Sequence, residues 1–519
     1  MLFQPDGNLW DTLVVEDDDG VFHNFYLAFH GCVGHLTSGD LVHWEKQADI
    51  DFRLPGTWCE QGECLTGSIF KWEGRWLYSI GSFWNGRAAY GFAVSDDLYH
   101  WELRDIDHPV ICDGEIQLPQ GCELNENEIE SGWHDPCFRI DKEGILHAYM
   151  QANLPKRTHR DTGAVIAHLI SKDSIHWERQ APLVHLGTKI KSPSCPSVFD
   201  YNGKWYLTFI DHGSGGMRWH TSGRTDTSGT YYMVADSPDG PYEFPQNPLL
   251  LGSGCAHQDS WAGRVIKING QPFIYSHFSF PVAVNSLKKI VQTEDYGLKC
   301  IYDTSIEELS TGDWIKICEA NHRCESERWN DLGEWISTDS VITGEAEIMG
   351  SAACIAEQKR DFILRADISM SYGATAGFAL RAKDYPGKSW MPVDELPFSV
   401  PNQRKAVVVR LDFERQLLEI TSLEKSNLEG YGVPLYNLVI GGDEILYDCC
   451  HKELQYGKKY NVQIVVRGCY YDVYLDDELI ISKSMKEYSC GDLELIVERG
   501  KVFFTNVMIK DLEPLEFTE

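Results

Sequence analysis

The chain has 519 residues, more than one hydrophobic core usually serves, so we expect two domains. Its 46 basic and 78 acidic residues give a net charge of −32. A surface this acidic repels nucleic acid and anionic membranes, and it disfavours an anionic polymer as a ligand.

The chain carries no targeting or metal-binding pattern. The opening residues MLFQPDGNLW lack a positively charged region followed by an apolar core, and no run of about 18 apolar residues occurs. The 16 cysteines are scattered without paired metal-ligand spacing. We therefore predict a cytoplasmic protein with reduced thiols, without a metal or another cofactor, and without a nucleic-acid or membrane partner.

The first part of the chain contains an internal repeat, which indicates architecture before local propensity does. The repeated sequence is Ser-x-Asp-x-x-His-Trp, in copies of decreasing similarity at 38–44, 95–101, 171–177, 235–242 and 310–314. Between the copies lie β-branched and aromatic runs such as Tyr206–Ile210, preceded by hairpin signals such as Asn202-Gly203. Each unit predicts three strands, a tight turn and a short outer strand. The rings of His43, His100 and His176 are expected to satisfy the turn backbone.

Each unit also opens with a small cluster of polar residues at the start of its first strand. The clusters are Trp10-Asp11-Thr12, Leu65-Thr66-Gly67-Ser68, His134-Asp135-Pro136, Ser194-Cys195-Pro196 and His257-Gln258-Asp259-Ser260. The first strands of a propeller line one central channel, so these clusters would meet at its mouth. We expect the functional site there.

The second part of the chain follows a polar stretch without alternation. Alternating segments then recur at 362–368, 376–381, 406–413, 460–467, 470–475 and 502–510. Many strands at near-regular spacing indicate a β-sandwich with a packing or accessory role. We therefore predict an all-β chain with a five-bladed β-propeller over residues 1–320, a linker over 321–335 and a β-sandwich over 336–519.

These features resemble glycoside hydrolase family 32, the fructosidases and invertase-like enzymes, and the related furanosidases of family 43. Ser38–Trp44 is similar to that family's Ser-x-Asp-Leu-x-x-Trp, and His134-Asp135-Pro136 is similar to its Arg-Asp-Pro. Tyr471–Glu478 is similar to a segment of its sandwich. The resemblance covers nearly the whole chain, and it implies a propeller, a following sandwich and a glycosidase that binds a small carbohydrate.

The resemblance also implies site residues. The family's first-blade nucleophile falls on Asp11, without the Asn, Pro and Gly that surround it in the family. The Asp of Arg-Asp-Pro falls on Asp135, with His134 in place of Arg. The family's general acid, the Glu of Glu-Cys-Pro, falls on Ser194. A hydroxyl is far too weak an acid for this role near neutral pH, and losing acid catalysis typically costs about 10²–10⁴-fold.

Glycoside hydrolysis usually needs two carboxyl groups that flank the scissile bond. We assign Asp11 as nucleophile or base and Asp135 as the group that stabilises the transition state. Glu63 is the best-placed proton donor by sequence, and Asp259 is second. Glu128 and Glu130 lie in an acidic loop before Asp135 and follow as candidates.

The same clusters supply predicted substrate contacts. Aromatic rings stack on the apolar face of a sugar, and Trp10 and Trp133 each adjoin a site Asp. The other predicted contacts are His134, Ser68, Ser194, His257 and Asp259.

Three functions stay open at this point. The first is a hydrolase of short fructosides or related furanosides. The second is a carbohydrate-binding propeller without catalysis, which Ser194 favours. The third is a fructosyl-transfer enzyme with the same site. The sandwich packs either on its own propeller or on a partner subunit, and the latter would make a homo-oligomer.

Overall fold

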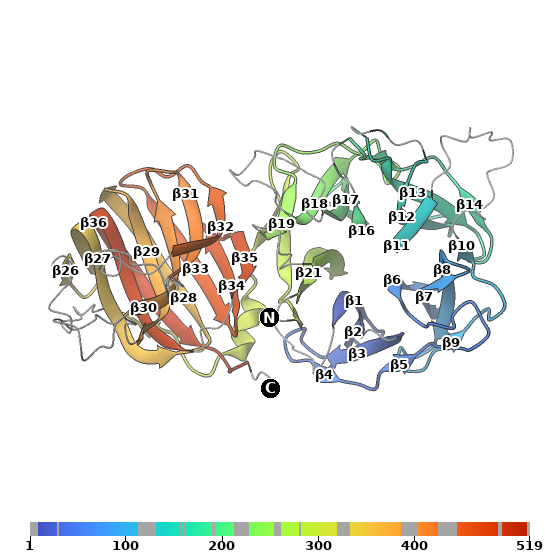
Figure 1. Cartoon of the computed structure of the whole chain (residues 1–519), viewed down its shortest axis with the longest axis horizontal. Coiled ribbons are helices and arrows are strands. Elements are labelled where there is room, and N and C mark those ends of the chain that lie inside the picture. Colours follow the sequence, from blue (N-terminus) through green and yellow to red (C-terminus); the bar gives the residue numbers. More distant parts are fainter. Residues whose placement is uncertain are drawn as a thin grey trace, which may run out of the picture. The chain divides into compact units, whose positions relative to one another are not determined.

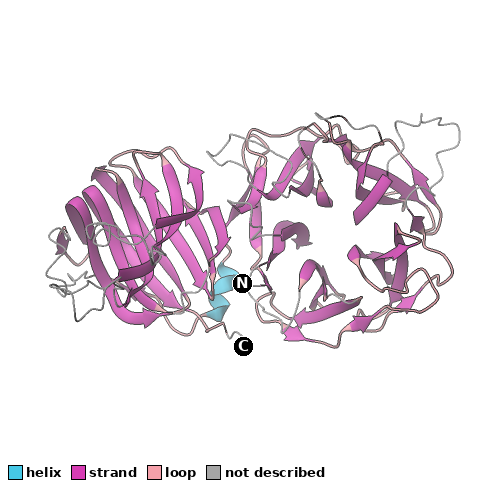
Figure 2. Cartoon of the chain, in the orientation of Figure 1, coloured by secondary structure: helices cyan, strands magenta, loops and turns pink. Residues whose placement is uncertain are grey.

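The structure is a computed structural model that describes residues 9–28, 31–112, 131–155, 158, 161–188, 190, 192–211, 228–253, 261–279, 282–318, 333–385, 403–423, 444–485 and 490–515. The chain forms two compact units, one that ends at Ser305 and one that begins at Ile306. Strands dominate both (Figure 2). None of the helices among these residues is both long and apolar enough to cross a membrane.

Unit 1 is a ring of five antiparallel blades (Figure 1), of which blades 1 to 4 are separate small sheets. Blade 1 holds β1 (Trp10–Glu16), β2 (Phe22–Leu27), β3 (Cys32–Ser38), β4 (Glu45–Lys46) and β5 (Ile50–Asp51), and blade 2 holds β6 (Leu65–Trp72), β7 (Arg75–Trp84), β8 (Arg87–Ser95), β9 (Glu102–Leu103) and β10 (Ile111–Cys112). Blade 3 holds β11 (Ser131–Ile140), β12 (Leu146–Asn153), β13 (Ala164–Ser171), β14 (Trp177–Arg179) and β15 (Val184–His185), and blade 4 holds β16 (Ser194–Tyr201), β17 (Lys204–Asp211), β18 (Ser228–Ala235) and β19 (Leu249–Ser253). Blade 5 holds β20 (Trp261–Ile268), β21 (Gln271–Ser279), β22 (Val282–Val284), β23 (Lys288–Gln292) and β24 (Leu298–Ile301).

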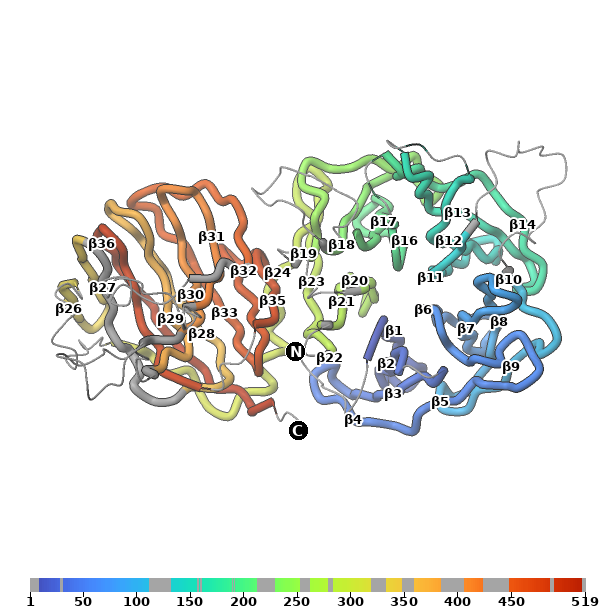
Figure 3. The backbone as a smooth tube through the Cα atoms, viewed as in Figure 1, coloured from blue at the N-terminus to red at the C-terminus, as the bar shows by residue number. Residues whose placement is uncertain are grey.

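The first strand of every blade lies at the centre of the ring. β1, β6, β11, β16 and β20 each contact the next first strand, and β20 contacts β1 again, so the ring is closed (Figure 3). Large apolar side chains fill the space between neighbouring blades, as Phe25 and Tyr78 do between blades 1 and 2. The predicted five-bladed propeller is therefore confirmed.

The repeated Ser-x-Asp sequence forms the same turn in blades 1 to 3. In blade 1, Asp40 Oδ1 accepts the N–H groups of Val42 and His43, both at 2.8 Å, and Oδ2 lies 2.7 Å from His43 Nδ1. Asp97 and Asp173 make the same three contacts in the next two blades. The sequence predicted that the His ring satisfies the turn backbone. Instead the Asp does so, and the ring holds the Asp.

The fifth copy of this turn lies elsewhere than predicted. Thr293 bonds to Asp295, and Tyr296 has φ 64°, close to the φ of 65° at the matching Leu41 of blade 1. This copy has Thr in place of Ser and lacks His-Trp, so the sequence pattern did not reveal it. The predicted copy, Ser310–Trp314, belongs to unit 2, where the Arg365 guanidinium lies 4.4 Å from the centre of the Trp314 ring.

The division between the units therefore differs from the predicted boundary at residue 320. A 3₁₀ helix, η2 (Thr304–Leu309), spans the division, and β25 (Ile315–Lys316) already pairs with β36 (Gly491–Asp511) of unit 2. Of the predicted linker, residues 321–332 lie outside the described residues, and its end belongs to β26 (Glu334–Ser337).

Unit 2 consists of two sheets that share two long strands, β27 (Val341–Lys359) and β36. Residues 492–498 of β36 pair with β29, and residues 501–511 pair with β28. One sheet continues through β29 (Thr375–Tyr385), β30 (Gln403–Asp412), β31 (Leu417–Leu423) and β32 (Glu444–His451), and the other through β28 (Phe362–Tyr372), β33 (Lys459–Arg467), β34 (Tyr470–Leu475) and β35 (Glu478–Ser484). This is the predicted β-sandwich.

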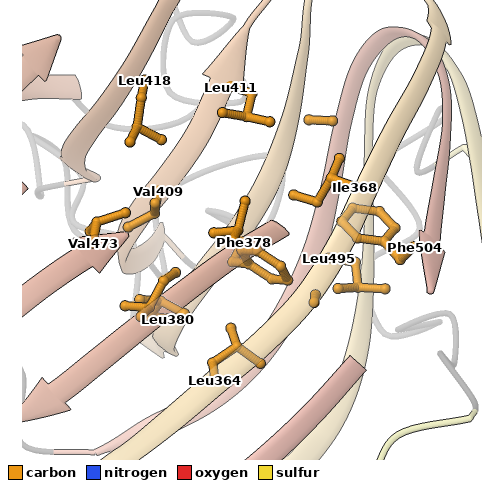
Figure 4. Packing of buried hydrophobic residues seen from close by; sticks show 14 of the residues in the cluster. Leu364, Ile368, Phe378, Leu380, Val409, Leu411, Leu418, Val473, Leu495 and Phe504 are labelled. Carbon is orange, nitrogen blue, oxygen red and sulfur yellow. The ribbon is translucent and has the colours of Figure 1, made fainter. Parts of the chain in front are cut away.

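Apolar residues from both sheets of unit 2 form one core (Figure 4). Phe378 and Phe504 lie in its middle with ring centroids 5.7 Å apart. Where β36 passes from one sheet to the other, a Cβ at Gly500 would lie 2.2 Å from the Tyr372 carbonyl oxygen. The bend of the shared strand therefore requires a residue without a side chain.

Blades 1 and 3 each contain a buried pair of histidines. His23 Nδ1 lies 2.9 Å from His35 Nε2, and His147 Nδ1 lies 2.9 Å from His168 Nε2. Burial lowers the pKa of His35 to about 3 and the pKa of His168 to about 4. Both rings therefore stay neutral in the folded protein at pH values where the unfolded chain binds protons.

These pairs predict a loss of stability in mild acid. Below the unfolded His pKa of about 6.5, the free energy of unfolding should fall with decreasing pH, by about 1.4 kcal/mol per pH unit for each ring that stays neutral. Chemical denaturation of the wild type and His168→Gln between pH 7.5 and 5 measures this slope. The slope should be shallower in His168→Gln, because Gln keeps a donor for His147 and does not titrate.

The exposed His451 provides the control. His451→Gln should leave the slope unchanged. Equal slopes in the wild type and His168→Gln would show that the buried pair does not cause the acid sensitivity.

Candidate active site at the centre of the ring

Every first strand of the ring begins with a β-bulge at the same place. The registers are interrupted between Trp10 and Leu13, Leu65 and Ser68, His134 and Cys137, Ser194 and Ser197, and Trp261 and Arg264. The first residue inside each bulge is thus equivalent, namely Asp11, Thr66, Asp135, Cys195 and Ala262. Four of these have positive φ, between 45° and 55° for Asp11, Asp135, Cys195 and Ala262. A bulge re-aims side chains at a strand end, here towards the centre of the ring.

Asp11 and Asp135 are each held by a donor from the next blade. The Thr66 hydroxyl of β6 donates a hydrogen bond to Asp11, which is 9% exposed. Asp135 Oδ2 accepts the backbone N–H of Cys195 at 3.2 Å and the Cys195 thiol at 3.7 Å. The Asp135 N–H itself donates to the Tyr90 hydroxyl at 3.1 Å. Both predicted catalytic carboxyls are therefore oriented by neighbouring blades, Asp11 in a buried and Asp135 in a partly exposed position.

The two carboxyl groups interact electrostatically. Burial, and then the negative charge of Asp135, raise the pKa of Asp11 to about 7. The Thr66 hydrogen bond and the Arg264 charge act in the opposite direction. A carboxyl near this pKa can change protonation state at neutral pH, as residues in acid–base chemistry do.

Two groups beside this pair escaped the sequence reasoning. Cys195 holds Asp135, and Arg264 of β20 is 4% exposed with its charge acting on both Asp11 and Asp135. The sequence contains a signal for Arg264, which is the fourth residue of β20, as Leu13 is of β1 and Ser68 is of β6. The predicted polar cluster of the fifth unit ended at Ser260 and so did not include it.

Ser194 occupies the position where the resemblance requires a Glu. Its hydroxyl donates to Gln151 Oε1 at 2.7 Å, and Gln151 Nε2 donates to the Ser192 hydroxyl at 2.8 Å. Ser194 thus joins blade 4 to blade 3 through neutral groups and offers no acid.

Glu63 lies just before β6 and is 1% exposed. Its Oε2 accepts the N–H of Gly81 at 3.1 Å, and its Oε1 accepts the Tyr78 hydroxyl at 3.4 Å. Burial raises its pKa well above the ordinary value, although these hydrogen bonds oppose the change. Burial therefore favours the protonated form of Glu63, but both of its oxygens are hydrogen bonded to β7.

The predicted substrate contacts fall into different surroundings. Trp10 is half-buried with its ring 4.9 Å from the His277 ring. Trp133 is 1% exposed, lies in the core between blades 2 and 3, and is covered by the Arg179 guanidinium at 4.8 Å. Its predicted stacking on a sugar is wrong, because its ring faces are already packed.

Of the remaining predicted contacts, His134 and Ser68 are partly exposed. His134 is the residue before the bulge of β11, and Ser68 is the residue after the bulge of β6. His257 and Asp259 lie outside the described residues, as do the further acid candidates Glu128 and Glu130.

One group among the described side chains has atoms close enough to hold a metal ion, namely His147, His168 and Asp239. The two rings are hydrogen bonded to each other, and the Arg139 guanidinium lies 3.7 Å from Asp239. These contacts already satisfy the group. The matching pair in blade 1, His23 and His35, has the same geometry, which indicates a structural role.

No family model and no curated protein matches this sequence. Solved structures match nearly all of the chain. Sucrose-6-phosphate hydrolase from Lactobacillus gasseri is 13% identical with a TM-score of 0.62, and the match covers 99% of this chain and 92% of that one. The GH32 β-fructofuranosidase of Bombyx mori is 13% identical, with a TM-score of 0.60 and coverage of 99% and 93%. A fructosyltransferase from A. japonicus is 12% identical, with a TM-score of 0.62 and coverage of 99% and 94%. This likeness shows the fold, a propeller followed by a sandwich.

The site predicts opposite titration shifts for two variants. Asp135→Asn should lower the pKa of Asp11, because a neighbouring negative charge disappears, and Thr66→Val should raise it, because the hydroxyl that stabilises the carboxylate is lost. Each midpoint should move by on the order of one pH unit. The measurement is carboxyl ¹³C NMR of Asp-labelled protein, with the Asp11 signal assigned by its loss in Asp11→Asn.

Asp97→Asn in an outer turn of blade 2 is the control, and it should leave the Asp11 midpoint in place. If Asp135→Asn also leaves it in place, the two carboxyls do not interact.

Proposed function

We propose that this protein is a glycosidase that acts on short fructosides or related furanosides. The observation that carries the proposal is the pair Asp11 and Asp135, which lie at equivalent bulges and are held by donors from neighbouring blades. Enzymes that hydrolyse a glycosidic bond usually have two carboxyl groups that face one site.

The two carboxyls have different tasks in this proposal. Asp11 attacks the anomeric carbon or activates a water, and it must be ionised to do so. Asp135 is fixed by the Cys195 N–H and thiol, and its charge stabilises the oxocarbenium-like transition state. Since the pKa of Asp11 is about 7, the rate should fall as the pH drops below neutrality.

The substrate class rests on the fold and on the charge of the chain. The names of the similar structures describe enzymes of sucrose 6-phosphate, β-fructofuranosides and fructosyl transfer. A net charge of −32 favours a neutral sugar over an anionic polymer. We assign Trp10, which adjoins Asp11 in the sequence, as the aromatic residue that stacks on the apolar face of the sugar.

The residue that protonates the leaving group is the one role in this mechanism that we do not assign to a single residue. Burial favours the protonated form of Glu63, and leaving-group protonation would require it to exchange its bond to Tyr78 for one to the substrate. Asp259, Glu128 and Glu130 are the other candidates. We further infer a reducing, cytoplasmic location, because seven of the described cysteines form no disulfide, namely Cys32, Cys59, Cys64, Cys137, Cys195, Cys318 and Cys450.

The test is release of reducing sugar from a panel of short fructosides and arabinosides. Asp11→Asn should abolish cleavage, because the nucleophile is lost. Glu63→Gln should lower kcat by about 10²–10⁴-fold if Glu63 donates the proton. Glu60→Gln, an exposed neighbour, is the matched control and should keep full activity. Full activity of folded Asp11→Asn would exclude the proposed mechanism.

The second candidate is a carbohydrate-binding propeller without catalysis, and Ser194 is the observation that favours it. In that case the wild type cleaves nothing, yet a sugar of the panel raises its melting temperature. A fructosyl-transfer enzyme would instead release a longer fructoside from the same panel.

Ser194→Glu distinguishes these cases. A carboxyl at this position restores the missing acid, so cleavage should appear or rise by about 10²-fold or more. Ser194→Gln, of similar size but without acidity, should show no gain. If the wild type cleaves and Ser194→Glu is no faster, the donor lies elsewhere.

A further inference from the structure

Arg264 places a guanidinium in the closed centre of the propeller. It ends the bulge of β20, the position that Leu13, Ser68, Cys137 and Ser197 hold in the other blades. The side chain is 4% exposed. A buried cation is costly unless charges or hydrogen bonds compensate it.

Groups from all five blades act on Arg264. They are Asp11 of β1, Tyr78 of β7, Asp135 and Cys137 of β11, Cys195 of β16 and Tyr275 of β21. Among them only Asp11 and Asp135 are carboxylic acids, so they are its counter-charges. The positive charge therefore lies beside the carboxyl pair of the candidate site.

The donors of Arg264 are not used up by these neighbours. Among the residues that the structure describes, none accepts a hydrogen bond from its Nε or Nη2, and neither Asp11 nor Asp135 forms a bidentate ion pair with it. In a structural ion pair, an Arg guanidinium usually donates two parallel hydrogen bonds to one carboxylate. Arg264 instead acts on the carboxyl pair through its charge, whereas Thr66 and Cys195 donate hydrogen bonds to the pair.

We propose that Arg264 is a positioning residue of this site. Its buried guanidinium is the counter-charge of the Asp11–Asp135 pair and keeps Asp11 available as a carboxylate. A buried carboxyl group beside a second negative charge ionises less readily without such compensation. Desolvation and Asp135 oppose the ionised form of Asp11, whereas Thr66 and Arg264 support it.

The consequence for catalysis rests on the proposed function, but the electrostatic role does not. The first experiment therefore measures no turnover. Carboxyl ¹³C NMR of Asp-labelled protein follows the titration of Asp11 in the wild type, Arg264→Met and Arg264→Lys. Asp11 should titrate near pH 7 in the wild type and in Arg264→Lys, and at least about one pH unit higher in Arg264→Met.

An unchanged Asp11 midpoint in folded Arg264→Met would overturn the proposal. Arg264→Gln, which keeps polarity without charge, replaces Arg264→Met if the latter does not fold, and it should show the same upward shift. Circular dichroism and the melting temperature establish folding for each variant.

If the wild type cleaves a fructoside, kcat/KM provides a second readout. The acid limb of its pH profile should move to higher pH in Arg264→Met and return in Arg264→Lys. A uniform loss of activity without a shifted limb would indicate that Arg264 only supports the structure. If no substrate is cleaved, the glycosidase proposal fails, and the NMR titration still decides the role of Arg264.

Discussion

A buried carboxyl group beside a second carboxyl group is the constraint on which the site depends. Asp11 is buried, so the negative charge of Asp135 acts on it with little screening by water. Each is held by a donor from the following blade, Thr66 for Asp11 and Cys195 for Asp135. These donors are in place because the five first strands close into a ring. The geometry of the site is therefore a property of ring closure rather than of any one blade.

The β-bulges at the strand openings bring the site residues together at the centre of this ring. An unbroken strand would alternate its side chains between the two faces of the blade. The extra residue at each opening gives Asp11 and Asp135 a positive φ and turns them towards the centre. Non-glycine residues adopt such conformations at a cost, which the surrounding hydrogen bonds offset.

The internal repeat made much of this predictable. Five openings of equivalent strands indicated that Asp11 and Asp135 share one place, and alternation indicated the sandwich. The burial of individual side chains was harder to predict from the sequence. Trp133 and Trp10 each adjoin a site Asp, yet only the fold shows that Arg179 and the core cover Trp133. The donors from other blades, and Arg264 at the centre, depend on contacts between residues far apart in sequence, which no local pattern contains.

The absent acid and the central cation belong to one electrostatic balance. A Glu at position 194 would put a third carboxyl beside Asp11 and Asp135, with Arg264 the one guanidinium that the described residues show acting on that pair. Ser194 instead makes a neutral link to Gln151. The replacement lowers the cost of burying charge, and it removes the group that would protonate a leaving oxygen. Stability and proton donation therefore make opposite demands on this position. A chain that keeps Ser194 and still cleaves a glycoside must either draw its proton from another carboxyl or act on a bond whose leaving group departs without one.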